Sequence, residues 1–208
     1  MPGQKVPEEY RRNDILRAAY DVAARQGIEA LTVRAVADRA AVSHGTVLFH
    51  FDRRDALVAS LLDSVLDATT VLHIAPEVER LPRPAGRLHA LLRSEMERLS
   101  GDPRPFRLFL EYWALGVRHA GIRRKVSGAL DRYRASFRVI TTSVLAERTA
   151  VRRSRARRNR AMSTPDGLAA VAVSFIHGCA LQAVIDPKAF SVRQHFDAAA
   201  HMLDGLLS

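Results

Sequence analysis

The chain has little cysteine, few aromatic residues and no long run of uncharged apolar residues. The single cysteine, Cys179, excludes a disulfide framework within the chain and favours a reducing compartment, of which the cytoplasm is the simplest. Because no apolar run reaches about 18 residues, no segment is expected to span a membrane. The N-terminus, MPGQKVPEEYRRND, contains acids and lacks the pattern of a signal peptide. No stretch alternates apolar and polar residues as a strand does, so the fold is expected to be all-α.

Helix-favouring residues, chiefly Ala, Leu and Arg, dominate what is present, and a hydrophobic content of 48% is enough for a core. Apolar periodicity and capping signals predict about nine helices, at 8–26, 33–40, 44–50, 53–72, 87–100, 104–119, 122–150, 166–185 and 188–207. The expected helix starts include Thr32, Ser43, Asp52 and the Thr164-Pro165 pair. The residues expected to face inward on the first two helices are Ile15, Ala19, Val22, Ala23, Val36 and Ala37. Prolines and a glycine in 76–86 predict a linker. We expect a head of three helices at 8–52 and a larger helical body at 53–208.

The net charge of +10 suggests a polyanionic partner, but the charge is not concentrated in the head. Residues 1–60 hold nine Lys/Arg against eight Asp/Glu, whereas residues 61–208 hold 23 against 14. Six arginines fall within 152–160, where mutual repulsion disfavours an isolated helix. That segment is interpreted as a solvated connector, with an auxiliary contact to DNA or another polyanion as the alternative. A DNA-binding role must therefore be argued from a motif.

The stretch TVRAVADRAAVSHGTVLFHFDRRDAL, residues 32–57, predicts two short helices joined by a tight turn. The second helix begins with His44, Gly45 and Thr46, which keep its leading edge slim and polar and would let it enter a major groove about 12 Å wide. Thr32 can cap the first helix, and Arg34 on its first turn could reach a guanine edge or a phosphate. The alternative is that this stretch is only a corner of a helical bundle.

The order of these residues resembles the TetR family of bacterial transcriptional regulators. The resemblance covers about residues 11–60 and includes Ile15-Leu16-x-Ala18-Ala19, Gly27, Leu31-Thr32-Val33-Arg34-x-Val36-Ala37, Ala41-Val42-Ser43-His44-Gly45-Thr46-Val47, His50-Phe51 and Asp55-Ala56-Leu57. It implies a homodimeric repressor that places two recognition helices in successive major grooves of a near-palindrome. It also implies that bases are read by Arg34, His44, Gly45 and Thr46, and that phosphates are held by Thr32, Ser43, His50 and Arg54.

Three positions depart from the family pattern. Ala41 replaces the usual turn glycine, which costs about 1 kcal/mol if its φ is positive. Leu48 replaces a tyrosine whose hydroxyl meets a phosphate, and the neighbouring Phe49 offers no hydroxyl, although both positions belong to the expected DNA-facing set. Arg54 replaces a lysine and so keeps the charge with a different geometry.

Aromatic residues concentrate in RPFRLFLEYWALGVRH, residues 104–119, which resembles the ligand-binding half of the TetR subgroup typified by the choline–betaine regulator. The candidate effector-binding residues are Phe106, Phe109, Tyr112, Trp113, Arg118, His119, Phe137 and Phe175. Aromatic rings with Glu111 would suit a cationic ligand. The alternative is that most of these side chains are ordinary core.

The segment 166–185 is rich in alanine and glycine, which permit close approach of helices. Together with 188–207 it is expected to form a homodimer interface, as the resemblance also implies; the alternative is that both helices close the monomer core. The eight histidines show no ligand spacing and no catalytic triad or phosphate loop is present, so we expect no metal, no cofactor and no enzyme activity.

The resulting hypothesis is a cytoplasmic, ligand-responsive repressor that a small-molecule effector releases from a palindromic double-stranded DNA operator. Two alternatives are an all-α small-molecule-binding protein whose head has lost its DNA role, and an activator of transcription with weakened DNA contact.

Overall fold

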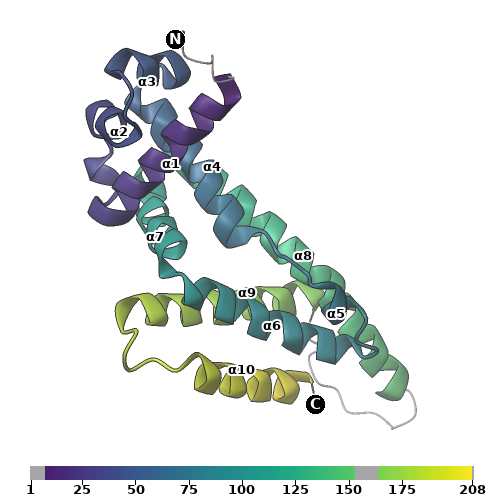
Figure 1. Cartoon of the computed structure of the whole chain (residues 1–208). Helices are drawn as coiled ribbons and strands as arrows, with labels where there is room; N and C mark the ends of the chain where they lie inside the picture. Colours follow the sequence, from purple (N-terminus) through teal and green to yellow (C-terminus); the bar gives the residue numbers. More distant parts are fainter. Residues whose placement is uncertain (1–7, 153–163, 208) are drawn as a thin grey trace. The chain divides into compact units, whose positions relative to one another are not determined.

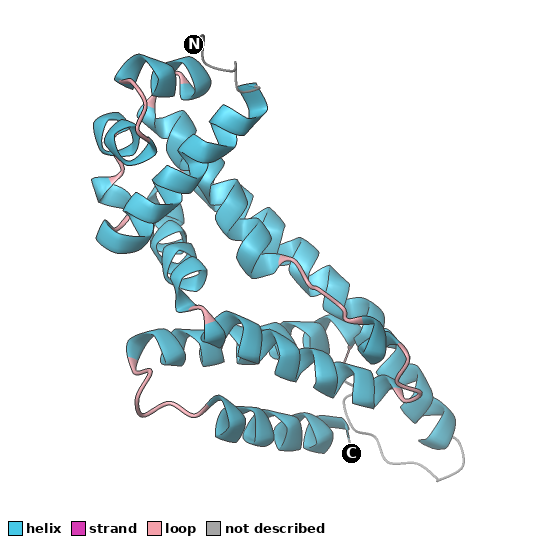
Figure 2. Ribbon diagram, in the orientation of Figure 1, coloured by secondary structure: helices cyan, strands magenta, loops and turns pink. Residues whose placement is uncertain are grey.

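The structure is a computed structural model, and it describes residues 8–152 and 164–207. Within these residues every regular element is a helix (Figure 2). The elements, labelled in Figure 1, are α1 Glu8–Gln26, η1 Ile28–Ala30, α2 Val33–Ala40, α3 His44–Phe51, α4 Arg54–Thr70, α5 Pro76–Glu79, α6 Pro84–Gly101, α7 Pro103–Arg118, α8 Ala120–Arg152, α9 Pro165–Ile185 and α10 Val192–Leu207. The prediction of an all-α chain is confirmed.

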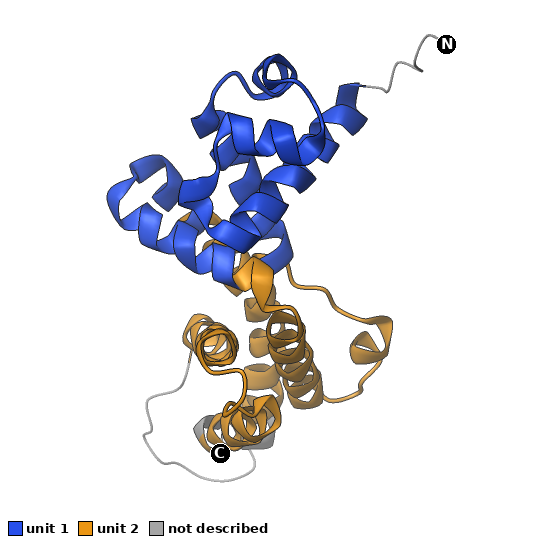
Figure 3. Ribbon diagram, turned by 60° about the vertical axis from the view of Figure 1, so that its left-hand side comes forward, with its two compact units in different colours: residues 1–69, 107–126 blue, residues 70–106, 127–208 orange. Residues whose placement is uncertain are grey.

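The chain folds into two compact units, coloured separately in Figure 3. Unit 1 comprises the chain up to Thr69 together with residues 107–126, and unit 2 comprises residues 70–106 and the chain from Ser127 onward. Unit 1 therefore extends past the expected domain boundary at residue 52. It includes most of α4, all of α7 except its first turn, and the start of α8.

The core of unit 1 is formed where α1 packs on α2 and α2 packs on α3. The stripe expected to face inward on α1, namely Ile15, Ala19, Val22 and Ala23, is buried throughout. On α2 the predicted inward residues Val36 and Ala37 are buried as well. These positions recur at helical spacing, so removal of their apolar surface from water holds the three helices together.

The core of unit 2 is formed by α6, α9 and α10, which pack against one another. By length and composition α9 could cross a membrane, since its most apolar 18 residues have a mean hydropathy of 2.0. The premise that no run of about 18 residues is apolar enough to span a membrane is therefore wrong for α9. The physical reason is that α9 is a core helix: eight of its side chains, several of them alanines, are buried in unit 2. Such a helix in a soluble protein passes the same test of composition.

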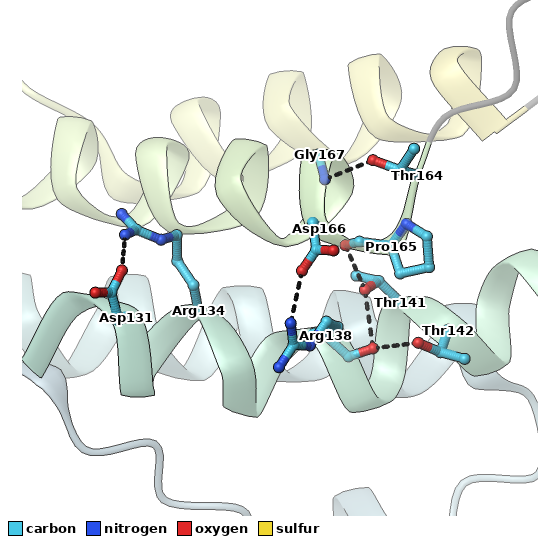
Figure 4. A network of polar contacts seen from close by, with 9 residues as sticks. All are labelled: Asp131, Arg134, Arg138, Thr141, Thr142, Thr164, Pro165, Asp166 and Gly167. Atoms are coloured by element: carbon cyan, nitrogen blue, oxygen red, sulfur yellow. Dashed lines mark hydrogen bonds and ion pairs between the residues drawn. The ribbon is translucent and has the colours of Figure 1, made fainter. Parts of the chain in front are cut away.

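The start of α9 is held by the polar contacts shown in Figure 4. Thr164 caps the helix by accepting a hydrogen bond from the Gly167 amide at 3.0 Å, and Pro165 occupies the first helical position, as predicted. The buried hydroxyl of Thr141 on α8 donates to the carbonyl of Pro165 at 2.9 Å. An exposed ion pair, Arg138–Asp166 at 3.0 Å, joins the same two helices.

The helix boundaries differ most clearly from those predicted in three places, and several other helix ends differ by one or two residues. The expected linker 76–86 contains α5 and the first turn of α6, because Pro76 and Pro84 each occupy a first helical turn rather than breaking a helix. Helix α10 begins at Val192 rather than 188, after a turn in which Asp186 accepts from the Ala189 amide at 3.1 Å. Asp52, expected to start α4, instead ends α3 with a φ of 57°. Of the arginine-rich segment, the part 153–160 lies outside the described residues.

Candidate nucleic-acid interface and effector region

The helix-turn-helix is formed by α2 and α3 of unit 1, and a side chain caps each helix. Thr32 accepts a hydrogen bond from the Ala35 amide at 3.1 Å. Ser43 accepts from the Thr46 amide at 3.0 Å, and its hydroxyl also lies 2.8 Å from that of Thr46. Both capping residues are exposed. The α2–α3 motif predicted from the sequence is therefore present, with capping hydroxyls at the helix starts where phosphates bind.

The turn between α2 and α3 requires the left-handed conformation. Ala41 has φ 53° and ψ 45°, and its amide together with that of Val42 closes α2 onto the carbonyls of Asp38 and Ala37. The departure noted at this position thus carries the expected cost of about 1 kcal/mol for a Cβ in this region. The turn geometry of the motif is kept in spite of it.

The two faces of α3 differ sharply. Val47 and Phe51 are buried against the rest of unit 1, whereas His44 and Gly45 are exposed and Phe49 is 75% exposed. A Cβ on Gly45 would meet only the Ser43 hydroxyl oxygen, at 3.8 Å, so packing within the unit does not require a glycine there. The outward face of α3 is narrow at its start and bears an aromatic ring near its end.

The other expected contact residues are placed as follows. Arg34 is exposed on α2, Leu48 is half-buried, and His50 is half-buried with its ring edge-on to Phe49 at 5.2 Å. Arg54 is exposed, but its guanidinium also serves the fold. Its Nε donates to the Leu31 carbonyl at 2.7 Å and its Nη2 donates to the Ile28 carbonyl at 3.2 Å. An internal role for Arg54 was missed, because nothing near it in the sequence identifies these acceptors.

Helix α7 contributes to unit 1 through two consecutive polar residues. The Glu111 carboxylate accepts from the Ile28 amide at 2.8 Å, and the Tyr112 hydroxyl donates to the Val58 carbonyl at 2.7 Å. Tyr112 is completely buried, and burial raises the pKa of its phenol, so the hydroxyl keeps its proton and donates. Both residues are thus hydrogen-bonded inside unit 1, and Trp113 beside them is 59% exposed.

The eight residues expected to bind the effector are divided between the units. Phe109, Tyr112, Trp113, Arg118 and His119 lie in unit 1; Phe106, Phe137 and Phe175 lie in unit 2. Unit 1 has a surface hollow of about 480 Å³ lined by Ile28, Glu29, Glu111, Ala114, Leu115, Val117 and Arg118. Of the predicted set, only Arg118 lines this hollow.

Unit 2 contains a buried polar and aromatic cluster that the sequence analysis missed. The Glu95 side chain is fully buried and accepts from Arg98 Nε at 2.9 Å, from Arg98 Nη2 at 2.6 Å and from the Tyr133 hydroxyl at 2.6 Å. The His177 ring stacks on Tyr133 at 5.9 Å, and burial, with a smaller effect of Arg134, lowers its pKa to about 4. The available signal was Glu95 itself, an acid within the apolar stripe of α6.

Two predicted effector residues adjoin this cluster. Phe106 lies 5.5 Å from the His177 ring, and Phe137 meets Tyr133 edge-to-face at 5.4 Å. Both phenylalanines are buried. Unit 2 therefore brings together aromatic rings, a neutral imidazole and a buried carboxylate that already accepts three hydrogen bonds within the unit.

An all-α chain with a capped helix-turn-helix and a separate helical unit has the architecture of a transcription regulator that binds DNA. Comparison with known proteins agrees: residues 15–61 match the family model for bacterial regulatory proteins of the tetR family, and residues 84–208 match the model for the C-terminal part of BetI-type transcriptional repressors. The chain therefore belongs to the TetR family. Its members are transcriptional regulators rather than enzymes, as expected from the sequence.

Individual relatives share limited sequence identity with this chain. An HTH-type transcriptional repressor of Mycobacterium tuberculosis is 36% identical over 74 residues, which are 35% of this chain and 39% of that protein. A transcriptional regulator from Pseudomonas aeruginosa has a similar structure, with a TM-score of 0.78 at 22% identity over 98% of this chain and 93% of that one. A regulator from Saccharomonospora viridis, solved in complex with choline, has a TM-score of 0.67 at 17% identity over 94% and 96%. At these identities the two structures show the fold alone.

Proposed function

We propose that the protein is a cytoplasmic repressor that binds a near-palindromic operator as a homodimer and leaves it when a small molecule binds. The observation that carries this proposal is the outward face of α3, which is slim at its start, capped by Ser43 and backed by the buried Val47. A helix with these features fits the major groove, and family membership supplies the context of transcription regulation.

The expected DNA contacts fall into two groups. Arg34, His44, Gly45 and Thr46 would face bases, with Leu48 and Phe49 beside them. Thr32, Ser43, His50 and Arg54 would hold phosphates. Exposure of Arg34, His44 and Gly45 supports the first group. The capping hydroxyls, which sit at two helix N-termini, support the second. Arg54 would contribute its charge while two of its nitrogens stay on carbonyls.

A homodimer would form through α9 and α10. Both helices carry exposed apolar side chains: Leu181 is 42% exposed, Ile185 76% and Met202 57%. A Cβ on Gly178 would meet nothing within 4 Å, so the surface of α9 is open there to a close-packed partner. Leu181→Glu with Ile185→Glu should produce monomers in sedimentation velocity, since it would bury two charges in the interface. Unchanged dimerisation by this variant would reject α9 as the contact.

The effector would bind within the BetI-like part of the chain, beside the cluster of Phe106, Phe137 and their neighbours in unit 2. Choline is the first probe, because aromatic rings near a carboxylate bind quaternary ammonium groups and a structural relative was solved with it. A rise in melting temperature with choline concentration, lost in Phe137→Ala, would support this class of ligand. No shift at millimolar choline would exclude it.

The decisive experiment is operator binding by fluorescence anisotropy, using the DNA upstream of the protein's own gene and a scrambled duplex of equal length. The double variant Thr46→Arg, Arg34→Ala should lose operator preference by about 1–3 kcal/mol per base contact. Arg104→Ala, an exposed charge change on α7 outside the proposed DNA and dimer surfaces, is the matched control and should bind normally. Equal binding of wild type to both duplexes, with steep salt dependence, would reject specific readout and favour a chain that has lost its DNA role.

A further inference from the structure

The segment between α1 and α2 is short, buried and conformationally demanding. Gly27 has φ 86° and ψ 166°, a combination that side-chain-bearing residues rarely adopt, and it turns the chain from α1 into η1. Ile28, the first residue of η1, and Leu31, the residue after it, are almost fully buried. The Thr32 amide then donates to the Ala30 carbonyl at 2.9 Å, one residue before α2 begins. A displacement of η1 would therefore also displace the start of α2.

Two side chains of opposite charge hold both backbone polar groups of Ile28. Its amide donates to the Glu111 carboxylate of α7 at 2.8 Å, and its carbonyl accepts from Arg54 of α4 at 3.2 Å. Arg54 also donates to the Leu31 carbonyl at 2.7 Å, so it spans the segment. Since a buried amide without a partner is costly, Glu111 satisfies a group that η1 leaves unpaired at its start.

The same stretch of α7 is attached to α4. Tyr112, the residue after Glu111, donates its hydroxyl to the Val58 carbonyl at 2.7 Å from a fully buried position. The Glu111 carboxylate oxygen also lies 3.4 Å from where a Cβ of Gly27 would stand, so the carboxylate closes over the turn itself. Helices α4 and α7 thus hold η1 from both sides while being hydrogen-bonded to each other.

We propose that Glu111 is a positioning residue for DNA binding, and that its hydrogen bond to Ile28 sets where η1, α2 and hence the recognition helix lie. This rests on the proposed function as a DNA-binding regulator. Glu111 itself contacts no DNA in this scheme. It acts by fixing the segment that leads into Thr32 and Arg34, so its loss lowers operator affinity without changing any residue of the α3 face.

Two conservative substitutions separate the hydrogen bond from the charge. Glu111→Asp keeps the charge but shortens the side chain by one carbon–carbon bond, roughly 1.5 Å, so it loses its reach to the Ile28 amide. Glu111→Gln loses the charge but keeps an acceptor oxygen at the same reach. The matched control is Glu29→Gln. Glu29 is exposed and lines the surface hollow of unit 1 together with Glu111, but within the described part of the chain its side chain makes no hydrogen bond or ion pair.

Each folded variant is titrated with operator DNA by anisotropy, and circular dichroism establishes the folded fraction. Glu111→Asp should bind operator about tenfold more weakly than wild type. Glu111→Gln and Glu29→Gln should bind within about threefold of wild type, because the neutral amide still accepts a hydrogen bond. Unchanged operator affinity in Glu111→Asp overturns the proposal, and so does the reverse order of Glu111→Asp and Glu111→Gln, which would indicate charge alone.

A second measurement needs no DNA. Hydrogen exchange of the Ile28 amide, followed by NMR in the free protein, should accelerate at least tenfold in Glu111→Asp and stay slow in Glu29→Gln. If the amide is equally protected in Glu111→Asp, the contact does not hold η1 and the proposal fails. If the wild-type protein shows no preference for operator over scrambled DNA, the proposed function is rejected, whatever the exchange result. An accelerated amide would then still show that Glu111 holds η1.

Discussion

The buried carboxylate of Glu95 allows a stability change to be worked out before it is measured. Three hydrogen bonds reach it, two from Arg98 and one from Tyr133, and none of its side-chain surface is exposed. Substitution of Arg98 by Met keeps the aliphatic stem and removes both guanidinium donors. The carboxylate is then buried with one neutral partner, and a stranded buried charge costs about 3–5 kcal/mol.

The lower end of that range applies here, because the Arg98 side chain is itself 29% exposed and water can enter in its place. For a protein of 150–250 residues, each kcal/mol lowers the melting temperature by about 2–4 °C. A loss of about 3 kcal/mol therefore predicts a decrease of roughly 6–12 °C for Arg98→Met. Thermal unfolding followed by circular dichroism at 222 nm and by calorimetry measures it.

Two further variants test the cause. Arg138→Met removes an ion pair from the surface of the same unit, where both partners are more than half exposed, and should cost less than about 1 kcal/mol. The triple variant Glu95→Met, Arg98→Met, Tyr133→Phe leaves no polar atom stranded and should recover most of the lost stability. The reasoning is refuted if Arg98→Met melts within 2 °C of wild type, or if the triple variant melts no higher than Arg98→Met.

Three other perturbations have clear expectations. Ala41→Gly should raise the free energy of unfolding in urea by about 1 kcal/mol, because its φ of 53° is costly for a Cβ; no gain would mean that the turn relaxes elsewhere. Ser43→Ala removes the cap on the Thr46 amide and should cost about 1 kcal/mol in the same titration; an unchanged midpoint would contradict the cap. His177 has a pKa of about 4 in the folded chain against 6.5 in the unfolded one, so the unfolded state binds more protons between these values. Stability should therefore fall as pH decreases from 6.5 to 4, by up to about 3 kcal/mol. His177→Phe should lose this component, and parallel pH profiles for the two proteins would exclude it.

Helix positions could be predicted closely where local chemistry decides them. Thr32, Ser43 and the Thr164-Pro165 pair each start a helix as expected, because a hydroxyl cap and a first-turn proline act within three residues of themselves. The prediction of a linker at 76–86 was wrong, because a proline disrupts the interior of a helix but is favourable in its first turn. The sequence around Pro76 does not distinguish these two positions.

The polar contacts that build the two units could not be predicted. Tyr112 was predicted as an effector-binding residue, with ordinary core as the alternative. Its hydroxyl donates to the carbonyl of Val58, 54 residues earlier, and a backbone carbonyl has no sequence signature. Glu111 was considered as a ligand group, whereas its partner is an amide 83 residues away. The outward face of α3 could be predicted, because the exposure of its side chains follows from residue spacing within one short helix.

Unit 1 is built from two separate stretches of the chain, so it cannot be completed until the second stretch has been synthesised. The segment up to Thr69 leaves the ribosome well before residues 107–126, which supply the partners of Ile28, Val58 and Asp63. Until residues 107–126 have left the ribosome, the amide of Ile28 and the carbonyl of Val58 therefore lack their hydrogen-bond partners. A product interrupted before α7 would lack all three of these contacts, so its helix-turn-helix should be less stable than in the full chain.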